Sequence, residues 1–320
     1  MNNSHHRTCG CIIQDQILME MVEGYRERRI EVEQACRIIE SDLGGTARGA
    51  FVTVTIPVVV HVVYNAAVEN ISDEQIASQI RILNEDFSAT NPDISDVPNF
   101  FKSLIGKSSI QFKLAKRAPD GSSTNGITRT QTTRSSFPPD EFLATGFIEP
   151  VKFDSSGGKD AWPSDKYLNM WVCNLRGGLL GYAQFPGGPA ETDGVVMDYQ
   201  YFGDIGTATP PFDKGRTATH EVGHYLNLRH IWGDDQNSAD PCSGSDLVND
   251  TPNQEYPSGG IPTHPRRSCG SPDMFMNYMD YTDDAGMFMF SKGQVVRMQA
   301  ALEGPRASLT TSDGLTAPCG

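Results

Sequence analysis

The chain lacks any apolar run near the roughly 20 residues that a membrane-spanning helix requires. This absence predicts a soluble protein. Residues 1–13 also lack the apolar core of a signal peptide, so either an export signal has been removed or the native chain has none. No internal repeat and no low-complexity tract is present, so Pro/Gly-rich stretches such as 185–189 are expected to be loops.

Positive charge is also scarce. The 320 residues include 26 Lys and Arg against 40 Asp and Glu, which gives a formal net charge of −14 at pH 7. This balance argues against nucleic acid and anionic membranes as partners and favours cationic substrates or bound calcium. Acidity can equally serve only to keep a secreted protein soluble. The length is sufficient for one large domain or two small ones.

The most informative stretch present is the run 220–230, which contains His220, Glu221, His224 and His230. On a helix, residues four apart lie one turn above each other, so His220 and His224 can bind one ion. Neutral imidazoles suit zinc, and three protein ligands leave a fourth position for water. Zinc lowers the pKa of its water towards about 7, and Glu221 can then act as general base. The spacing predicts a metalloprotease.

The position of the third histidine requires the helix to end. A ligand six residues after His224 cannot lie on the same helical face, so the chain must turn before His230. Asn227 is the expected end of the helix because, after Gly, Asn most readily adopts the left-handed conformation at a helix C-terminus.

This run resembles the metzincin signature H-E-x-x-H-x-x-G-x-x-H, with Asn227 in place of the signature glycine. Residues 277–284, Asn-Tyr-Met-Asp-Tyr-Thr-Asp-Asp, resemble the methionine turn of the pappalysin family. The resemblance includes 175–188, 215–219 and 246–252, and spans roughly 50–303. It implies an α+β fold in which a twisted mixed sheet with backing and active-site helices lies above an irregular lower subdomain, with the active-site cleft between them.

The resemblance implies roles for several further residues. Met279 forms an apolar floor beneath the zinc, and Tyr281 hydrogen-bonds the reacting carbonyl. The segment 177–183, which includes Leu179 and Gly181, forms the rim strand of the cleft. A glycine-rich edge strand can accept an extended peptide by strand addition, although an ordinary hairpin is the alternative.

Asp283 and Asp284 follow the methionine turn, where a metzincin builds the pocket for the residue after the scissile bond. A carboxylate there favours a cation, with Arg first because its guanidinium can form a bidentate pair, and Lys second. Asp284 matches the acidic pocket residue of the family. The alternative is that both aspartates are solvated loop residues.

The loop after the zinc motif is strongly anionic. Calcium, which takes 6 to 8 oxygen ligands, suits such a loop. The resemblance identifies Asp246, the Asn249 carbonyl and Thr251 as candidate calcium ligands, and no EF-hand pattern is present. The aspartates of the loop are Asp234, Asp235, Asp240, Asp246 and Asp250.

The seven cysteines leave at least one unpaired. The resemblance supports a disulfide between Cys242 and Cys269, which flank the aspartate-rich loop, and this bond would indicate an oxidising, secreted or extracytoplasmic setting. Cys173 lies in an apolar stretch, where an inert core thiol is expected.

Cys9 and Cys11 precede the family-like region. A thiolate is a strong zinc ligand, so one of them can fill the fourth coordination position and keep the enzyme latent. Residues 7–10 resemble switch segments of the family, which favours Cys9. The alternatives are a Cys9–Cys11 pair, an intermolecular bridge, or a separate site with His5 and His6.

The elements expected from periodicity support a division at residue 47. Residues 14–40 have helical spacing, 41–49 form a flexible connector, and β-forming residues begin at Phe51. Residues 1–47 are therefore interpreted as an inhibitory propeptide. Residues 48–320 form the catalytic domain, whose upper part extends to about 230 and whose lower part covers 231–320. Self-cleavage at the flexible Ala47–Arg48 bond would release the enzyme.

Further elements follow the same patterns. Ser72 and Gln75 form a predicted capping box for a helix that extends to Phe87, and a closing helix is expected over 291–302. His61 is expected to be a hydrogen-bonded core histidine. The methionines at 274, 276, 287 and 289 are expected to pack around the methionine turn. Strands are expected at 109–117, 126–130, 168–174 and 195–199.

The sequence therefore predicts a secreted, calcium-supported zinc endopeptidase, made as a zymogen, that cleaves before Arg or Lys and is inhibited by its own propeptide. The alternative is a calcium-stabilised peptide-binding module whose zinc site is permanently blocked. The presence of Glu221 argues against this alternative, because zinc binding alone does not require that residue.

Overall fold

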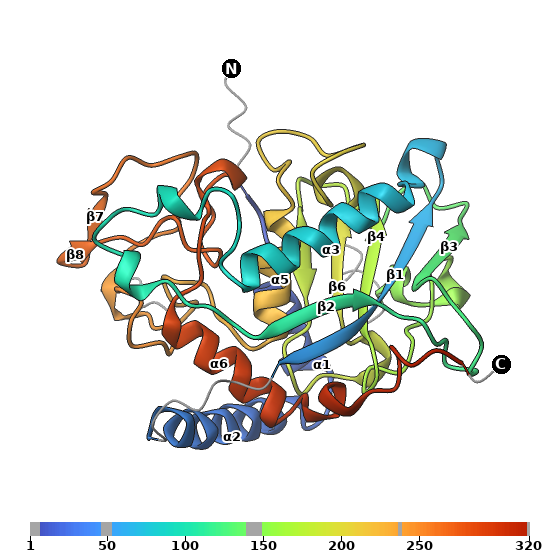
Figure 1. Cartoon of the computed structure of the whole chain (residues 1–320), viewed down its shortest axis with the longest axis horizontal. Coiled ribbons are helices and arrows are strands. Elements are labelled where there is room, and N and C mark those ends of the chain that lie inside the picture. Colours follow the sequence, from blue (N-terminus) through green and yellow to red (C-terminus); the bar gives the residue numbers. More distant parts are fainter. Residues whose placement is uncertain (1–6, 46–52, 139–148, 236–238, 319–320) are drawn as a thin grey trace.

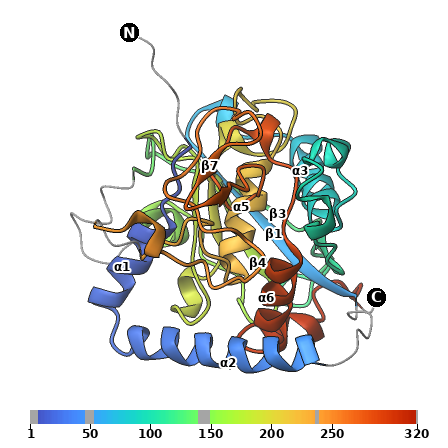
Figure 2. The same ribbon diagram turned by 90° about the vertical axis from the view of Figure 1, so that its left-hand side faces the viewer.

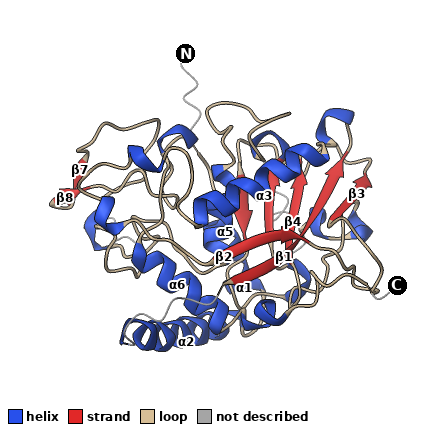
Figure 3. Ribbon diagram, in the orientation of Figure 1, coloured by secondary structure: helices blue, strands red, loops and turns tan. Residues whose placement is uncertain are grey.

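The computed structural model describes residues 7–45, 53–138, 149–235 and 239–318. A six-stranded sheet is built around β1 (Val54–Tyr64), and Figure 3 shows helices and loops on both of its sides. Nine of the eleven residues of β1 are buried. This explains why the strand is a nearly continuous run of β-branched residues rather than an alternating one. The start expected at Phe51 lies outside the described residues.

The sheet is mixed, as the sequence predicted. β1 pairs in parallel with β2 (Ile110–Leu114), with β3 (Ile127–Gln131) and, on its other side, with β4 (Leu168–Cys173). β6 (Val195–Asp198) continues the parallel part next to β4. β5 (Gly181–Ala183) is antiparallel to β6 and forms the last strand of the order β2-β1-β4-β6-β5. One side of β5 is therefore available for pairing.

Two helices pack together and link the sheet to the metal-binding motif. α3 (Asp73–Phe87) and α5 (Arg216–Tyr225) are in contact, and α5 also contacts β5 and β6 (Figure 1). Asp86 of α3 accepts a hydrogen bond from Thr219 of α5 (2.6 Å) and forms an ion pair with Arg216. The buried Asp86 therefore fixes α5 on the scaffold.

The capping box expected at Ser72 is only half formed. The Ser72 hydroxyl accepts from the Gln75 backbone amide (3.2 Å), as predicted. The Gln75 side chain instead donates to the Phe202 carbonyl (2.8 Å) and to the Thr207 hydroxyl (2.8 Å). A tertiary contact has replaced the local one, since Gln75 is 1% exposed and its amide must find partners inside the protein.

The C-terminal part of the chain is irregular. It holds the two-residue strands β7 (Arg267–Ser268) and β8 (Ser271–Pro272), followed by α6 (Lys292–Glu303) and a short 3-10 helix over Ala307–Thr311. A disulfide joins Cys242 and Cys269, as expected. A separate apolar cluster forms the interior of this part, and three of the four predicted methionines belong to it. Its buried residues are Val97, Phe101, Ile231, Trp232, Met274, Phe275, Met276, Phe288 and Met289.

The N-terminal segment contains two helices where the sequence predicted one over 14–40. α1 (Cys11–Met21) and α2 (Tyr25–Gly45) are separated by a turn that includes Gly24, at φ +70°. α2 lies along α6, which both Figure 1 and Figure 2 show at the lower edge of the molecule. The predicted connector 41–49 is helical over 41–45, where α2 continues, and the rest of it, with the Ala47–Arg48 bond, lies outside the described residues.

His61 is a core residue, as expected. Its ring nitrogens lie 2.7 Å from the Thr128 hydroxyl and 3.0 Å from the Asn169 amide oxygen, and it has no exposed surface. Burial lowers the pKa of His61 to about 4, so the ring is neutral near pH 7. In the described part of the chain, no helix is both long and apolar enough to span a bilayer.

Candidate active site

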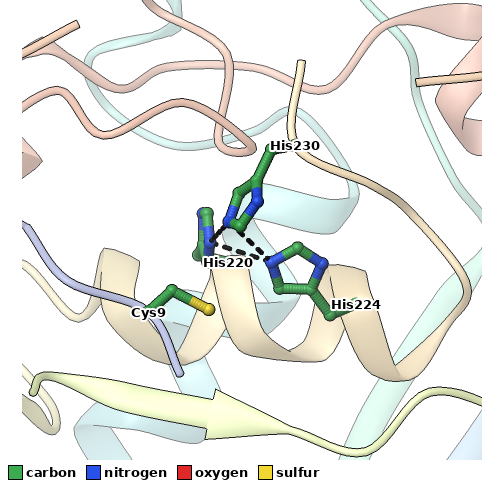
Figure 4. Close-up of side chains that lie close together, drawn as sticks. All are labelled: Cys9, His220, His224 and His230. Carbon is green, nitrogen blue, oxygen red and sulfur yellow. Dashed lines mark hydrogen bonds between the residues drawn. The ribbon is translucent and has the colours of Figure 1, made fainter. Parts of the chain in front are cut away.

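Three imidazoles converge at the end of α5. His220 and His224 lie one helical turn apart, and His230 returns to them after a turn at Asn227, whose φ of +72° is left-handed. The three Nε2 atoms lie 3.1, 3.2 and 3.3 Å from one another (Figure 4). Three tetrahedral nitrogens at the usual 2.0–2.1 Å from zinc are separated by about 3.3 Å, so the triangle fits this ion.

Each imidazole is oriented through its other nitrogen. His220 Nδ1 lies 2.7 Å from the Tyr278 carbonyl oxygen, and His224 Nδ1 lies 2.8 Å from that of Leu228. These acceptors fix Nδ1 as the protonated atom and leave Nε2 free to bind a metal. Backbone carbonyls leave no trace in the residue pattern, so the sequence did not reveal them.

The third histidine is oriented through Nδ1 by a carboxylate instead of a backbone carbonyl. His230 Nδ1 lies 2.6 Å from Asp234 Oδ1. Burial alone would lower the pKa of His230, but Asp234 raises it to about 10. The sequence analysis counted Asp234 only among the aspartates of the anionic loop and did not recognise this contact with His230. The spacing of four residues from His230 was the available signal.

Met279 lies beneath the metal-binding helix. It has no exposed surface, and a Cβ at Gly223 would lie 2.5 Å from the Met279 sulfur. Glycine at 223 therefore allows the close approach of the methionine between the two helical histidines. The ring of Tyr281 lies on the other side, with its centroid 5.0 Å from that of His230 and 5.9 Å from that of His220.

Two cysteines of the N-terminal segment reach the site. The Cys9 sulfur belongs to one cluster with the three Nε2 atoms, all within 4.8 Å of one another, and it points towards the imidazoles in Figure 4. The Cys11 thiol donates to Glu221 Oε2 (2.9 Å). The Cys9 thiol also donates to the Cys11 sulfur (3.0 Å), and the two residues form no disulfide. Of the two cysteines, Cys9 therefore lies with the three histidines and is 3.4 Å from Glu221 Oε2, whereas Cys11 makes the shorter contact with Glu221.

Glu221 is enclosed by this segment. It is 1% exposed, and burial together with the neighbouring Cys9 raises the pKa of its carboxyl well above the usual range. The carboxyl also lies under β5, where a Cβ at Gly181 would come within 3.0 Å of Glu221 Cγ. A carboxyl that is covered in this way, and whose charged form burial disfavours, is not available as a general base.

The N-terminal segment also pairs with the free side of β5. Leu180 donates its backbone amide to the Thr8 carbonyl (3.0 Å), and Gly10 donates to the Gly181 carbonyl (3.0 Å). The predicted rim residues Leu179 and Gly181 are both buried. The edge strand therefore accepts an extended chain by backbone bonding, as the sequence reasoning anticipated for a peptide.

Asp284 forms an ion pair with Arg7, a residue that the sequence reasoning did not single out. Neither side chain has more than 2% exposed surface. Arg7 also donates to the Thr217 hydroxyl (3.2 Å) and to the Thr282 carbonyl (3.3 Å). Asp284 is therefore a buried acidic group rather than a solvated loop residue. The adjacent Asp283 is half-buried.

Comparison with known proteins agrees with this geometry. A family model described as pregnancy-associated plasma protein-A, a peptidase family, matches residues 153–303. An extracellular metalloprotease of Arthroderma otae is 32% identical over 263 residues, which cover 79% of this chain and 80% of that protein. Extracellular metalloprotease 1 of Coccidioides posadasii is 33% identical over 269 residues, which cover 79% of each. The chain belongs to the pappalysin family.

Two solved structures of Tannerella forsythia extend the comparison. A promirolysin variant is 46% identical with a TM-score of 0.84, and the match covers 95% of this chain and 97% of that one. Mature mirolysin in complex with a cleaved peptide is 49% identical with a TM-score of 0.78, covering 85% and 100%. The pappalysin chain described above is thus a metalloendopeptidase with the metzincin fold that its sequence predicted.

The candidate calcium residues are only partly brought together. Asp246 is buried, and its carboxylate accepts from the Thr251 hydroxyl (2.7 Å) and the Val248 amide (3.0 Å). The Asn249 side chain is exposed. Asp250 lies elsewhere, because it accepts from the Ser291 hydroxyl (2.6 Å) at the start of α6.

The contact between His230 and Asp234 predicts a loss of metal affinity in Asp234→Asn. Removal of a carboxylate that orients a ligating histidine typically weakens metal binding about 10- to 100-fold. Zinc affinity is measured by competition with a chromogenic chelator. Asp235→Asn is the matched control, because Asp235 is 59% exposed. Equal affinities in the two variants would contradict the role assigned to Asp234.

Proposed function

We propose that this pappalysin is a secreted zinc endopeptidase, latent while residues 1–47 cover its cleft, that cleaves before Arg and less readily before Lys. One observation carries the proposal: Cys9 joins the three histidines while Arg7, two residues earlier, lies on Asp284. The N-terminal segment thereby occupies both the metal site and the acidic pocket next to it.

In the proposed mechanism His220, His224 and His230 hold the zinc, which when bound polarises the peptide carbonyl and acidifies a water molecule. Glu221 accepts the proton of the attacking water and passes it to the leaving amine. Tyr281 hydrogen-bonds the reacting carbonyl oxygen, and Met279 supports the histidines from below. The free side of β5, with Leu179 and Gly181, aligns the substrate backbone.

The specificity rests on the surroundings of Arg7. Its guanidinium is paired with Asp284, hydrogen-bonded to Thr217 and to the Thr282 carbonyl, and placed over the Phe212 ring at 5.0 Å. The planar guanidinium presents several N–H donors in a fixed arrangement that matches these acceptors, whereas a lysine has a single ammonium group. An arginine side chain after the scissile bond would find the same partners once the segment has left. Asp283 contributes negative charge beside the pocket.

The latent state is proposed to end with cleavage near Ala47–Arg48, which separates the propeptide 1–47 from the catalytic domain 48–320. The solved relatives support this division. The proenzyme match covers 95% of this chain and the mature enzyme match covers 85%. The proenzyme match therefore covers about a tenth more of this chain, as expected if the mature relative lacks an N-terminal segment.

We also propose a calcium ion at Asp246, the Asn249 carbonyl and Thr251. Burial raises the pKa of Asp246 to about 7, so the charged form is unfavourable unless a cation is near. A hard ion with carboxylate, carbonyl and hydroxyl ligands would supply that charge.

The first experiment follows the intact mass of the purified chain over hours with zinc and calcium present, beside a Glu221→Ala control. We expect the wild type to lose its first 47 residues and the control to stay whole, because removal of the general base stops hydrolysis. If an added protease is needed, or the cut maps elsewhere, self-activation at this bond is wrong. If an added Arg-containing peptide also survives, the permanently blocked peptide-binding module becomes the better account.

The proposed pocket predicts a change of specificity in Asp284→Asn. The processed variant should lose about 10- to 100-fold in kcat/KM for a peptide with Arg after the scissile bond, since a hydrogen bond to a charged group contributes about 1.5–3 kcal/mol. The kcat/KM for a matched peptide with Leu at that position should change little. Asp283→Asn is the control and should retain the Arg preference. A variant at 284 that still prefers Arg as strongly as the wild type would exclude this pocket.

Removal of calcium should lower thermal stability, measured in the Glu221→Ala background to avoid self-digestion. A ligand at 100 times its Kd stabilises the folded state by about 2.7 kcal/mol. We therefore expect the Tm to fall by several degrees with a calcium chelator and to recover when calcium is added back. Asp246→Ala should have the low Tm in both conditions. A wild-type Tm that does not respond to calcium would refute the site.

A further inference from the structure

The N-terminal segment has a second attachment far along the chain from Cys9. α2 packs on α6, with Val32, Cys36, Ala300 and Ala301 in the apolar part of the contact. The polar part is centred on Arg297 of α6, which is 1% exposed. Its guanidinium donates to Glu33 (2.6 and 2.8 Å) and to Glu40 (3.1 Å), so it binds two carboxylates of α2.

The same contact reaches the turn between the metal ligands. Asn227 lies three residues after His224 and three before His230, and its side chain is directed at α2. The amide nitrogen donates to Glu33 Oε1 (2.9 Å), and the amide oxygen accepts from Arg29 (3.1 Å). Its backbone carbonyl accepts from Arg297 (2.8 Å). Asn227 is 1% exposed, so these groups meet away from solvent.

Asparagine at position 227 therefore has a second role besides the left-handed turn. The left-handed backbone at φ +72° requires only Gly or Asn, and glycine stands here in the metzincin signature. Glycine would also allow the turn, but it has no side chain that could hydrogen-bond to α2. The asparagine amide supplies one donor and one acceptor, and α2 uses both, each with a charged partner. Hydrogen bonds to charged groups inside a protein are among the stronger ones.

We propose that Asn227 is the residue through which α2 recognises the turn between the metal ligands, and that this attachment holds the N-terminal segment independently of Cys9. It rests on the proposed function only in treating residues 1–47 as the latency segment. On this proposal Asn227 is a positioning residue for the latent state. Glu33 and Arg29 are its partners on α2, and Arg297 connects them to α6.

The test is hydrogen exchange on the whole chain carrying Glu221→Ala, so that no cleavage can occur. Asn227→Gly removes the amide and retains a residue that accepts the left-handed turn. We expect the amides of α2 to exchange about tenfold faster, because local opening is easier, while those of β1 and β4 stay unchanged. An unchanged α2, or equal acceleration in the sheet, would overturn the proposal.

Glu33→Gln provides the second arm. It should also speed exchange in α2, and the variant with both substitutions should exchange more slowly than the product of the two separate effects, because both changes act on the contact between Asn227 and Glu33. Multiplying effects would show that the glycine acts only through the backbone of the turn and would overturn the proposal.

Cys9→Ser, in the same inactive background, tests independence from the metal site. We expect exchange in α2 to remain as slow as in the parent chain. Loosening of α2 to the extent seen in Asn227→Gly would show that the helix is held only through Cys9. These measurements require no activity, so they stand apart from failure of the proposed Arg specificity.

Discussion

The metal site depends on how the chain returns after His224. Two histidines on one helical face supply two ligands, and the third must come from a chain that leaves the helix and turns back within six residues. A left-handed residue at 227 makes that turn possible. Contacts inside the protein then fix the position of the His230 ring, which stacks on Trp232 with ring centroids 4.4 Å apart and hydrogen-bonds to Asp234. The three Nε2 atoms meet because each ring is held from behind.

The same few residues serve both the scaffold and the pocket. Asp284 accepts from the Lys214 and Arg216 backbone amides (2.8 and 3.2 Å) at the start of α5, and it pairs with Arg7. A carboxylate at a helix N-terminus is stabilised by the helix dipole. The pocket charge is therefore anchored to the helix that carries the metal ligands. With the proposed specificity, this would connect the recognition of a cationic side chain to the position of the reacting atoms.

The contacts proposed to keep the enzyme latent are distributed along the N-terminal segment. Arg7, Cys9 and Cys11 contact the acidic pocket, the histidines and Glu221 in turn, and α2 contacts the turn at Asn227 some twenty residues later. The cleft contacts are made by groups that a substrate or water would otherwise meet. Those of α2 lie outside the cleft, where binding can be strong without resembling a substrate.

Local chemistry was enough to predict that the two helical histidines share a face, that the strand at the centre of the sheet is buried, and that a helix closes the chain, whereas the mixed sheet came from the resemblance. Histidines at i and i+4 must share a helical face, a continuous β-branched run must be buried on both faces, and Ser291 with Gln294 forms a capping box within four residues. Resemblance added Met279 and Asp284, which no periodicity singles out. Each of these inferences depends on residues close together in the chain or on a known motif.

Contacts between distant segments were decided only by the tertiary structure. Arg7 and Asp284 are separated by 277 residues, and Glu33 and Arg297 by 264. Nothing in the spacing of either pair distinguishes it from a solvated surface charge. Only the resemblance favoured Cys9 over Cys11, since their difference arises from pairing with the edge of β5, which places Cys9 with the histidines and Cys11 closest to Glu221. Burial assigns these roles, and burial is a property of the folded chain.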